Sequence, residues 1–133
     1  MEKNNSQDAP GAAGVDPRLA RHGGLSYLES PAVDACRSAA FYKIVLGWDV
    51  HGEETDHPKF SDQSGHLIGR WVTGRAISRE PGLLPFIYVE RINEVVANGG
   101  MIGKAPYPEG NLRVSTIRDP AGNVIGVWQQ QAR

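Results

Sequence analysis

The chain has 133 residues, of which 40% are hydrophobic, and its 14 Lys and Arg against 15 Asp and Glu give a net charge of -1. This length suits one compact domain or two small modules that share a core, and two independent domains would be hard to stabilise at this size. The near-neutral charge, without a basic stripe interleaved with aromatic residues, argues against a nucleic-acid partner. The single cysteine excludes an internal disulfide and is compatible with a reducing compartment.

The first 23 residues are rich in Asn, Ala, Gly and Pro and show no strand alternation, so we expect a flexible tail with a short helical turn around DPRLARH. The start of the chain has no apolar signal region, and no later apolar run approaches the roughly 18 residues that a membrane span needs. The sequence therefore predicts a soluble, cytoplasmic protein without a membrane partner.

From residue 24 onward the pattern alternates between extended and helical. LSYLE, residues 25–29, predicts a strand, and ACRSAAFYKIVLG, residues 35–47, predicts a helix that ends at its glycine. Three short extended pieces follow around WDVH, KFS and HLIGRWV. The charged stretch HGEETDH, residues 51–57, is expected to be a solvated hairpin loop, with a surface metal clip as the alternative.

The second half repeats this order. LPFIYVE, residues 84–90, predicts a strand, and INEVVANGG, residues 92–100, has the apolar spacing of a helix with a glycine stop. Extended pieces follow around MIGK, LRVSTI and NVIGVWQ, with APYPEGN as a connecting loop between the first two. The turn RDPAGN places Pro and Gly where a tight hairpin requires them.

Two segments at an offset of 57 residues make the repetition explicit. SDQSGHLIGRW, residues 61–71, aligns with RDPAGNVIGVW, residues 118–128, and the offset continues without a gap to Tyr27 and Leu84. We therefore predict an α+β fold of two tandem βαβββ modules, about 24–80 and 81–133, within a single domain over 24–133.

The stretches DACRSAAFYKIVLGW (34–48) and DPAGNVIG (119–126), together with the paired glycines 99 and 100, carry a family resemblance. On these residues the chain resembles the vicinal oxygen chelate superfamily, which includes glyoxalase I, extradiol dioxygenases and the fosfomycin and bleomycin resistance proteins. The resemblance implies a curled, partly open mixed sheet around a cleft. It also implies a homodimer, because two such chains pair in many members.

The resemblance further implies four metal-ligand positions, on the first and last strand of each module. Here they fall on Tyr27, Gly69, Leu84 and Gly126, of which only the tyrosine has a side-chain donor, and tyrosine is a rare ligand. A slip along the strands would bring in Glu29, with His66 and Glu90 nearby, but NVIGVWQ contains no acid or histidine. The sequence therefore predicts no family metal site and no cofactor, and the iron site of an extradiol dioxygenase fails for the same reason.

Because alternate residues of a strand face opposite sides, the metal positions that the resemblance implies mark which residues look into the cleft. The inward set is aromatic with one carboxylate, and it comprises Tyr27, Glu29, Gly69, Trp71, Leu84, Phe86, Tyr88, Gly126 and Trp128. The outward set is aliphatic (Leu28, Ile68, Val72, Ile87, Val89, Ile125 and Val127), with Arg70 as the exception. Such a cleft would bind a flat ligand, and Glu29 would favour a cationic one. The alternative is that the rings only fill the space between the sheets.

Two smaller features have more than one interpretation. The strand glycines at 69 and 126 indicate that something comes close to the backbone, either the tryptophans two residues later or a ligand. Cys36, on the predicted helix, is expected to be a small buried residue without a catalytic partner.

Three functions are compatible with these features. The first is a small-molecule binding protein of the bleomycin-resistance type, without the family metal. The second is a lyase or isomerase related to lactoylglutathione lyase, with a relocated metal or with Glu29 or Tyr27 as a base whose pKa is raised by desolvation. The third is a dimeric structural or interaction subunit.

Overall fold

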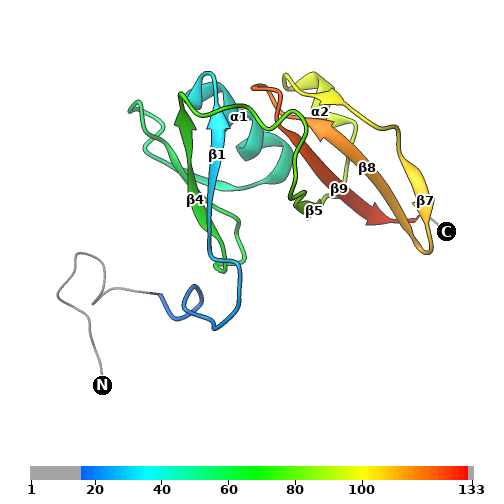
Figure 1. Cartoon of the computed structure of the whole chain (residues 1–133), viewed down its shortest axis with the longest axis horizontal. Helices are drawn as coiled ribbons and strands as arrows, with labels where there is room; N and C mark the ends of the chain where they lie inside the picture. Colours follow the sequence, from blue (N-terminus) through cyan, green and yellow to red (C-terminus); the bar gives the residue numbers. More distant parts are fainter. Residues whose placement is uncertain (1–15, 132–133) are drawn as a thin grey trace.

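The first half of the chain folds as the predicted βαβββ module (Figure 1). In chain order the elements are β1 (Tyr27–Ala32), α1 (Ala35–Leu46), β2 (Asp49–His51), β3 (Lys59–Ser61) and β4 (Ile68–Thr73). The strands form one sheet, called sheet A, in the order β1-β4-β3-β2. β1 runs parallel to β4, and the other pairs are antiparallel.

Helix α1 begins and ends where its sequence provides caps. The carboxylate of Asp34 accepts hydrogen bonds from the amides of Cys36 and Arg37, at 3.0 and 3.2 Å. Gly47 has a φ of 71°, a left-handed conformation that ends the helix with little strain. The predicted helix over 35–47 is therefore confirmed to within one residue.

The second module has the same strand order with two differences. Its elements are β5 (Phe86–Tyr88), α2 (Glu94–Ala97), β6 (Met101–Ile102), β7 (Tyr107–Glu109), β8 (Leu112–Arg118) and β9 (Val124–Gln130). They form sheet B in the order β5-β9-β8-β6, and β7 pairs with β8. α2 is shorter than the predicted helical segment, and β7 forms where a loop was predicted. In both places glycine in the left-handed region turns the backbone, Gly99 after α2 and Gly110 after β7.

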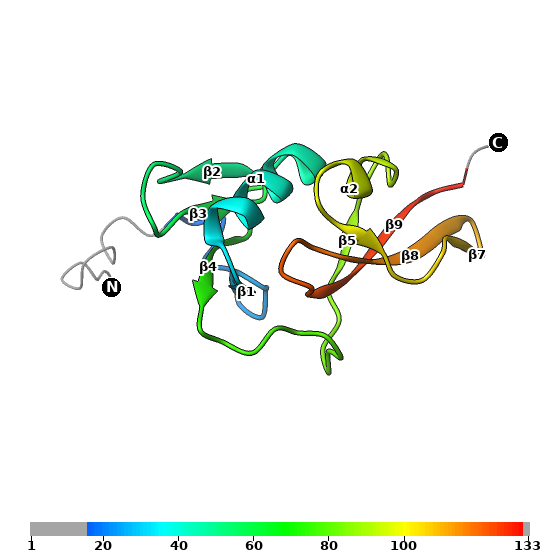
Figure 2. The same ribbon diagram turned by 90° about the horizontal axis from the view of Figure 1, so that it is seen from above.

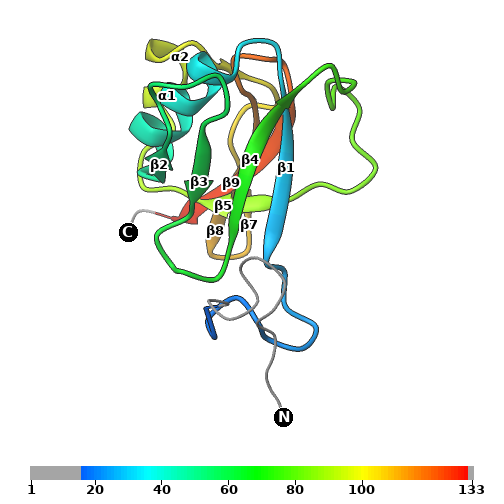
Figure 3. The ribbon, with the colours of Figure 1, turned by 90° about the vertical axis from the view of Figure 1, so that its left-hand side faces the viewer.

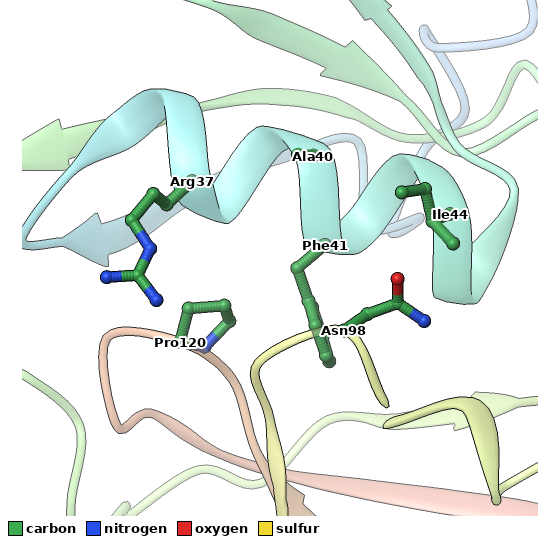
Figure 4. Close-up of a pocket in the computed structure, with 6 residues that line it drawn as sticks. All are labelled: Arg37, Ala40, Phe41, Ile44, Asn98 and Pro120. Atoms are coloured by element: carbon green, nitrogen blue, oxygen red, sulfur yellow. The ribbon is translucent and has the colours of Figure 1, made fainter. Parts of the chain in front are cut away.

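One hydrophobic core joins the modules, and α1 contributes buried side chains to it (Figures 1 and 2). One side of α1 packs on sheet A, and its other side meets the second module, where Phe41 lies against Gly100. A cavity of about 190 Å³ remains between α1, Asn98 and Pro120 (Figure 4). α1 covers one face of sheet A and leaves the other open, and the end of β1 also contacts the second module directly, since Nδ2 of Asn123 donates to the carbonyl of Pro31 at 2.7 Å.

Helices α1 and α2 lie side by side at one edge of the molecule (Figures 2 and 3). A buried carboxylate also joins the modules. Oδ2 of Asp119, in the hairpin before β9, accepts a hydrogen bond from the hydroxyl of Tyr42 on α1, with 2.8 Å between the two oxygens. Its other oxygen, Oδ1, accepts hydrogen bonds of 2.9–3.0 Å from the backbone amides of Ala121, Gly122 and Asn123. Burial and the adjacent Asp119 raise the pKa of Tyr42 well above its usual value.

The computed structural model describes residues 16–131, so most of the predicted tail over 1–23 lies outside the described residues. Residues 16–20 form the expected turn, in which the amides of Leu19 and Ala20 donate to the carbonyl of Asp16. The carbonyl of Arg18 lies 3.1 Å from Nδ1 of His66, which places this turn against the hairpin between β3 and β4. Over the described range, no helix is long and apolar enough to cross a membrane.

Candidate functional site: the open faces of the two sheets

The first and last strands of the two modules pair with registers that differ by one residue. In the repeat alignment Glu29 corresponds to Phe86, and Arg70 corresponds to Val127. Glu29 pairs with Arg70, whereas Phe86 pairs with Gly126, which is the counterpart of Gly69. Because alternate residues of a strand face opposite sides, this slip turns equivalent residues of β4 and β9 to opposite faces.

The orientation predicted for β4 is consequently wrong. Gly69 and Trp71 face the core beneath α1, and Trp71 is only 4% exposed. Its ring lies 4.8 Å from that of Phe60 and 5.7 Å from that of Tyr42, measured between centroids. The prediction failed because it took the inward orientation from the family's metal positions and applied it in the same register to both modules. In this module the helix covers aromatic rings.

The open face of sheet A, opposite α1, is polar. Tyr27, Glu29 and Arg70 lie on it, and Tyr27 is 51% exposed. The Glu29 carboxylate bridges two guanidinium groups: Nη2 of Arg70 at 3.1 Å and Nη2 of Arg75 at 2.7 Å. Hydrogen bonds from Arg75 and then from Arg70 lower the pKa of Glu29. The predicted rise in its pKa is therefore wrong, because arginines rather than rings surround the carboxylate.

The open face of sheet B is aromatic, and its residues have the orientation that the sequence predicts. Phe86 is 50% and Tyr88 47% exposed, and Trp128 lies beside them with its ring centroid 4.9 Å from that of Tyr88. The alternate residues Ile87 and Val127 face the core. Leu84 precedes β5 and is partly buried.

Each strand glycine makes room for a ring from its own module. A Cβ on Gly69 would collide with the carbonyl of Leu28 and the ring of Phe60, and one on Gly126 would collide with the ring of Phe86. The close approach that the glycines indicated is therefore real. The groups that come close are these phenylalanines rather than the tryptophans.

The family metal does not fit the side chains at its four positions. Gly69 and Gly126 are covered by rings, Leu84 has no donor, and only Tyr27 could offer an oxygen. Glu29, the acid nearest to this set, already binds two arginines. In the described part of the chain, no three His, Cys, Asp or Glu side chains come together as a metal-binding group.

The charged stretch HGEETDH begins at His51, the last residue of β2, and its other residues lie in the loop between β2 and β3. It turns at Gly52 with a φ of 76°, and Glu53 pairs with Lys43 of α1 at 3.1 Å. Cys36 lies beside this loop and is exposed, so the prediction that it is buried is wrong. Its sulfur is 3.6 Å from the carbonyl of Thr55.

A groove of about 430 Å³ lies between the end of α1 and the segment from β5 to α2. Its apolar wall is formed by Ile44, Val45 and Leu46, and its other lining residues are Gly47, Gln63, Tyr88, Val89, Glu90, Arg91 and Glu94. Sequence reasoning missed this groove because it exists only where the modules meet. Reasoning also missed Arg75, which reaches Glu29 from the linker after β4 and shows no pattern in the sequence.

The sequence matches no protein-family model and no curated protein. Solved structures share its fold. A glyoxalase/bleomycin resistance protein/dioxygenase family enzyme from Burkholderia phytofirmans PsJN has a TM-score of 0.60 at 18% identity, covering 82% of this chain and 100% of that one. TnmS3, an antibiotic binding protein from Streptomyces sp. CB03234, has a TM-score of 0.57 at 19% identity, covering 82% and 97%.

TioX from Micromonospora sp. ML1 also superposes, with a TM-score of 0.56 at 18% identity over 82% of this chain and 100% of that one. These structures share an architecture with the chain although fewer than one residue in five is identical. The chain therefore has the glyoxalase/bleomycin-resistance fold of the vicinal oxygen chelate superfamily, built from two tandem βαβββ modules.

Proposed function

We propose that this protein binds a flat, partly apolar small molecule on the open faces of its sheets, without the family metal. The observation that carries the proposal is the aromatic face of sheet B, where Phe86, Tyr88 and Trp128 lie side by side and two of them are about half exposed. Solvent-exposed aromatic side chains that are held on a sheet can stack against a planar ligand. The antibiotic-binding neighbour TnmS3 supports a ligand of this kind by analogy of fold.

A second copy of the chain completes the site in this proposal. Within one chain, Tyr27 and Phe86 lie on the open faces of two separate sheets. A homodimer that places the open face of sheet A against sheet B of the partner subunit would enclose a ligand between them. Such pairing would also cover the exposed rings of both faces.

The enzymatic alternative is a lyase or isomerase with Glu29 or Tyr27 as the base. It ranks second because the two arginines lower the pKa of Glu29, which weakens that carboxylate as a proton acceptor near neutral pH. The third function, a subunit that acts only through pairing, would use the same exposed aromatic residues for protein contact.

Calorimetric titration with a panel of fused-ring aromatic compounds tests the proposal. We expect a bound compound to lose at least about fivefold in affinity in Trp128→Ala and in Phe86→Ala, because an aromatic contact contributes about 1 kcal/mol or more. Met101→Ala, on the exposed edge strand β6, is the matched control and should bind as the unmodified protein does. A panel without a single binder, or binding that both aromatic variants leave unchanged, would contradict the proposal.

A further inference from the structure

We infer that the open face of sheet A binds an anionic group of the ligand, a carboxylate or a phosphate, through Arg70 and Arg75. This inference rests on the proposed function and adds the charge of the ligand to it. It also replaces the expected cationic ligand with an anionic one. That expectation was based on Glu29 alone, whereas Arg70 and Arg75 both bind that carboxylate.

A row of ionisable side chains crosses all four strands of this face. In register the row reads His51 on β2, Lys59 on β3, Arg70 on β4 and Glu29 on β1. Lys59 and Arg70 are direct cross-strand neighbours, and like charges in that position repel. Glu29 is the one acid in the row, so its charge offsets only part of this repulsion.

Positive charge remains after every ion pair on this face is counted. Glu29 neutralises one of its two arginines, and within the described residues Lys59 makes no ion pair. The other acid on this face is Asp49, two residues from His51 on the outermost strand and opposite Ser61 in the register. Around Arg70 the charge is therefore positive, and an anion there would relieve the repulsion.

The two guanidinium groups are held in place with donors to spare. Nε and Nη2 of Arg70 both donate hydrogen bonds to one oxygen of Glu29, and Nη1 of Arg70 donates none to it. Arg75 donates one hydrogen bond to the other oxygen, from its Nη2. The side chains are 49% and 50% exposed, so the remaining N–H groups can reach a ligand. Planar arginine donors fixed in advance are suited to carboxylate and phosphate oxygens.

Tyr27 gives the same face a surface for the apolar part of the ligand. It precedes Glu29 by two residues on β1, so both side chains point outward about 7 Å apart along the strand. An acid group attached to an aromatic ring that stacks on Tyr27 would therefore lie near the arginines that bind Glu29. The ligand class that fits this face is a flat aromatic acid or an aryl phosphate.

Titration of the full chain with four matched probes tests the inference: 2-naphthoate, 2-naphthyl phosphate, 2-naphthylmethanol and 2-naphthylmethylamine. We expect at least one of the two anions to bind tenfold or more tightly than the neutral alcohol, and the amine to bind least. Arg70→Gln and Arg75→Gln should each remove most of this preference and leave the affinity for the alcohol unchanged. Lys43→Gln, at an ion pair with Glu53 on the other side of α1, is the control for a lost positive charge.

A second measurement does not depend on an aromatic ligand. Inorganic phosphate should raise the thermal midpoint of the protein more than sodium chloride does at equal ionic strength, and both arginine variants should lose this difference. Equal effects of the two salts, or an unchanged phosphate effect in both variants, would overturn the inference. If the alcohol still binds in that case, the proposed function stands and only the charge of the ligand is wrong.

Discussion

Glu29 illustrates how the neighbours of one residue decide its chemistry. Its sequence context, between tyrosine and leucine on one side and serine and proline on the other, suggests an apolar site and a weak acid. In the folded chain its carboxylate meets Arg70 from the adjacent strand and Arg75 from the linker, and its pKa falls. No local pattern could predict Arg75, because a side chain 46 residues away supplies the contact through the tertiary fold.

The lowered pKa of Glu29 predicts a pH-dependent contribution to stability. A carboxylate with a lowered folded-state pKa stabilises the fold above its usual value near 4.5 and loses this effect as the pH falls through the folded value. Glu29→Gln should therefore have a lower thermal midpoint than the unmodified protein at pH 7, and the difference should disappear in strong acid. Thermal unfolding between pH 2 and 7 measures this, with Glu54→Gln in the exposed 51–57 loop as the control.

The strands and the first helix show which features of an element the sequence periodicity can predict. The extended piece KFS coincides with β3, and α1 ends at the glycine that the sequence indicates. Periodicity does not reveal which face of a strand the helix covers, so Trp71 was placed in the cleft although it packs in the core. The repeat itself was misleading here, because a one-residue difference in register turns Trp71 and Trp128 to opposite faces.

The two strand glycines should respond differently to the same substitution. In Gly69→Ala the new methyl would collide with the backbone carbonyl of Leu28 and the buried ring of Phe60, so we expect a loss of about 3 kcal/mol from overpacking. In Gly126→Ala it would meet the ring of Phe86, which is half exposed and can rotate away, so the loss should be about 1 kcal/mol. Denaturant unfolding compares the pair, and equal losses would contradict the difference in surroundings.

The relative placement of the two modules is a property of the whole molecule, and it could not be predicted from the sequence. The offset of 57 residues predicts that there are two modules, but their relative placement depends on contacts such as Phe41 with Gly100 and Tyr42 with Asp119. None of these residues is distinguished by periodicity from an ordinary core or turn residue.

The proposed homodimer predicts a particle of twice the 14.4 kDa chain mass in sedimentation at micromolar concentration. Phe86→Arg would place a charge on the covered face of sheet B and should shift the protein to the monomer, because an unpaired charge in an interface costs several kcal/mol. Met101→Arg, on the exposed edge strand β6, should leave the dimer intact. A monomeric unmodified protein would argue against the paired site while leaving ligand binding on each face to be tested separately.

The opposite placement of Trp71 and Trp128 also gives the protein two separate optical reporters. Trp71 and Trp48 lie in the core, at 4% and 7% exposure, so their emission should follow unfolding and be shielded from a quencher such as iodide. Trp128 lies on the open face beside Tyr88, where an arriving planar molecule would change its emission first. With Trp128→Phe as the reference, the intrinsic fluorescence of the chain can separate occupancy of the aromatic face from loss of the fold.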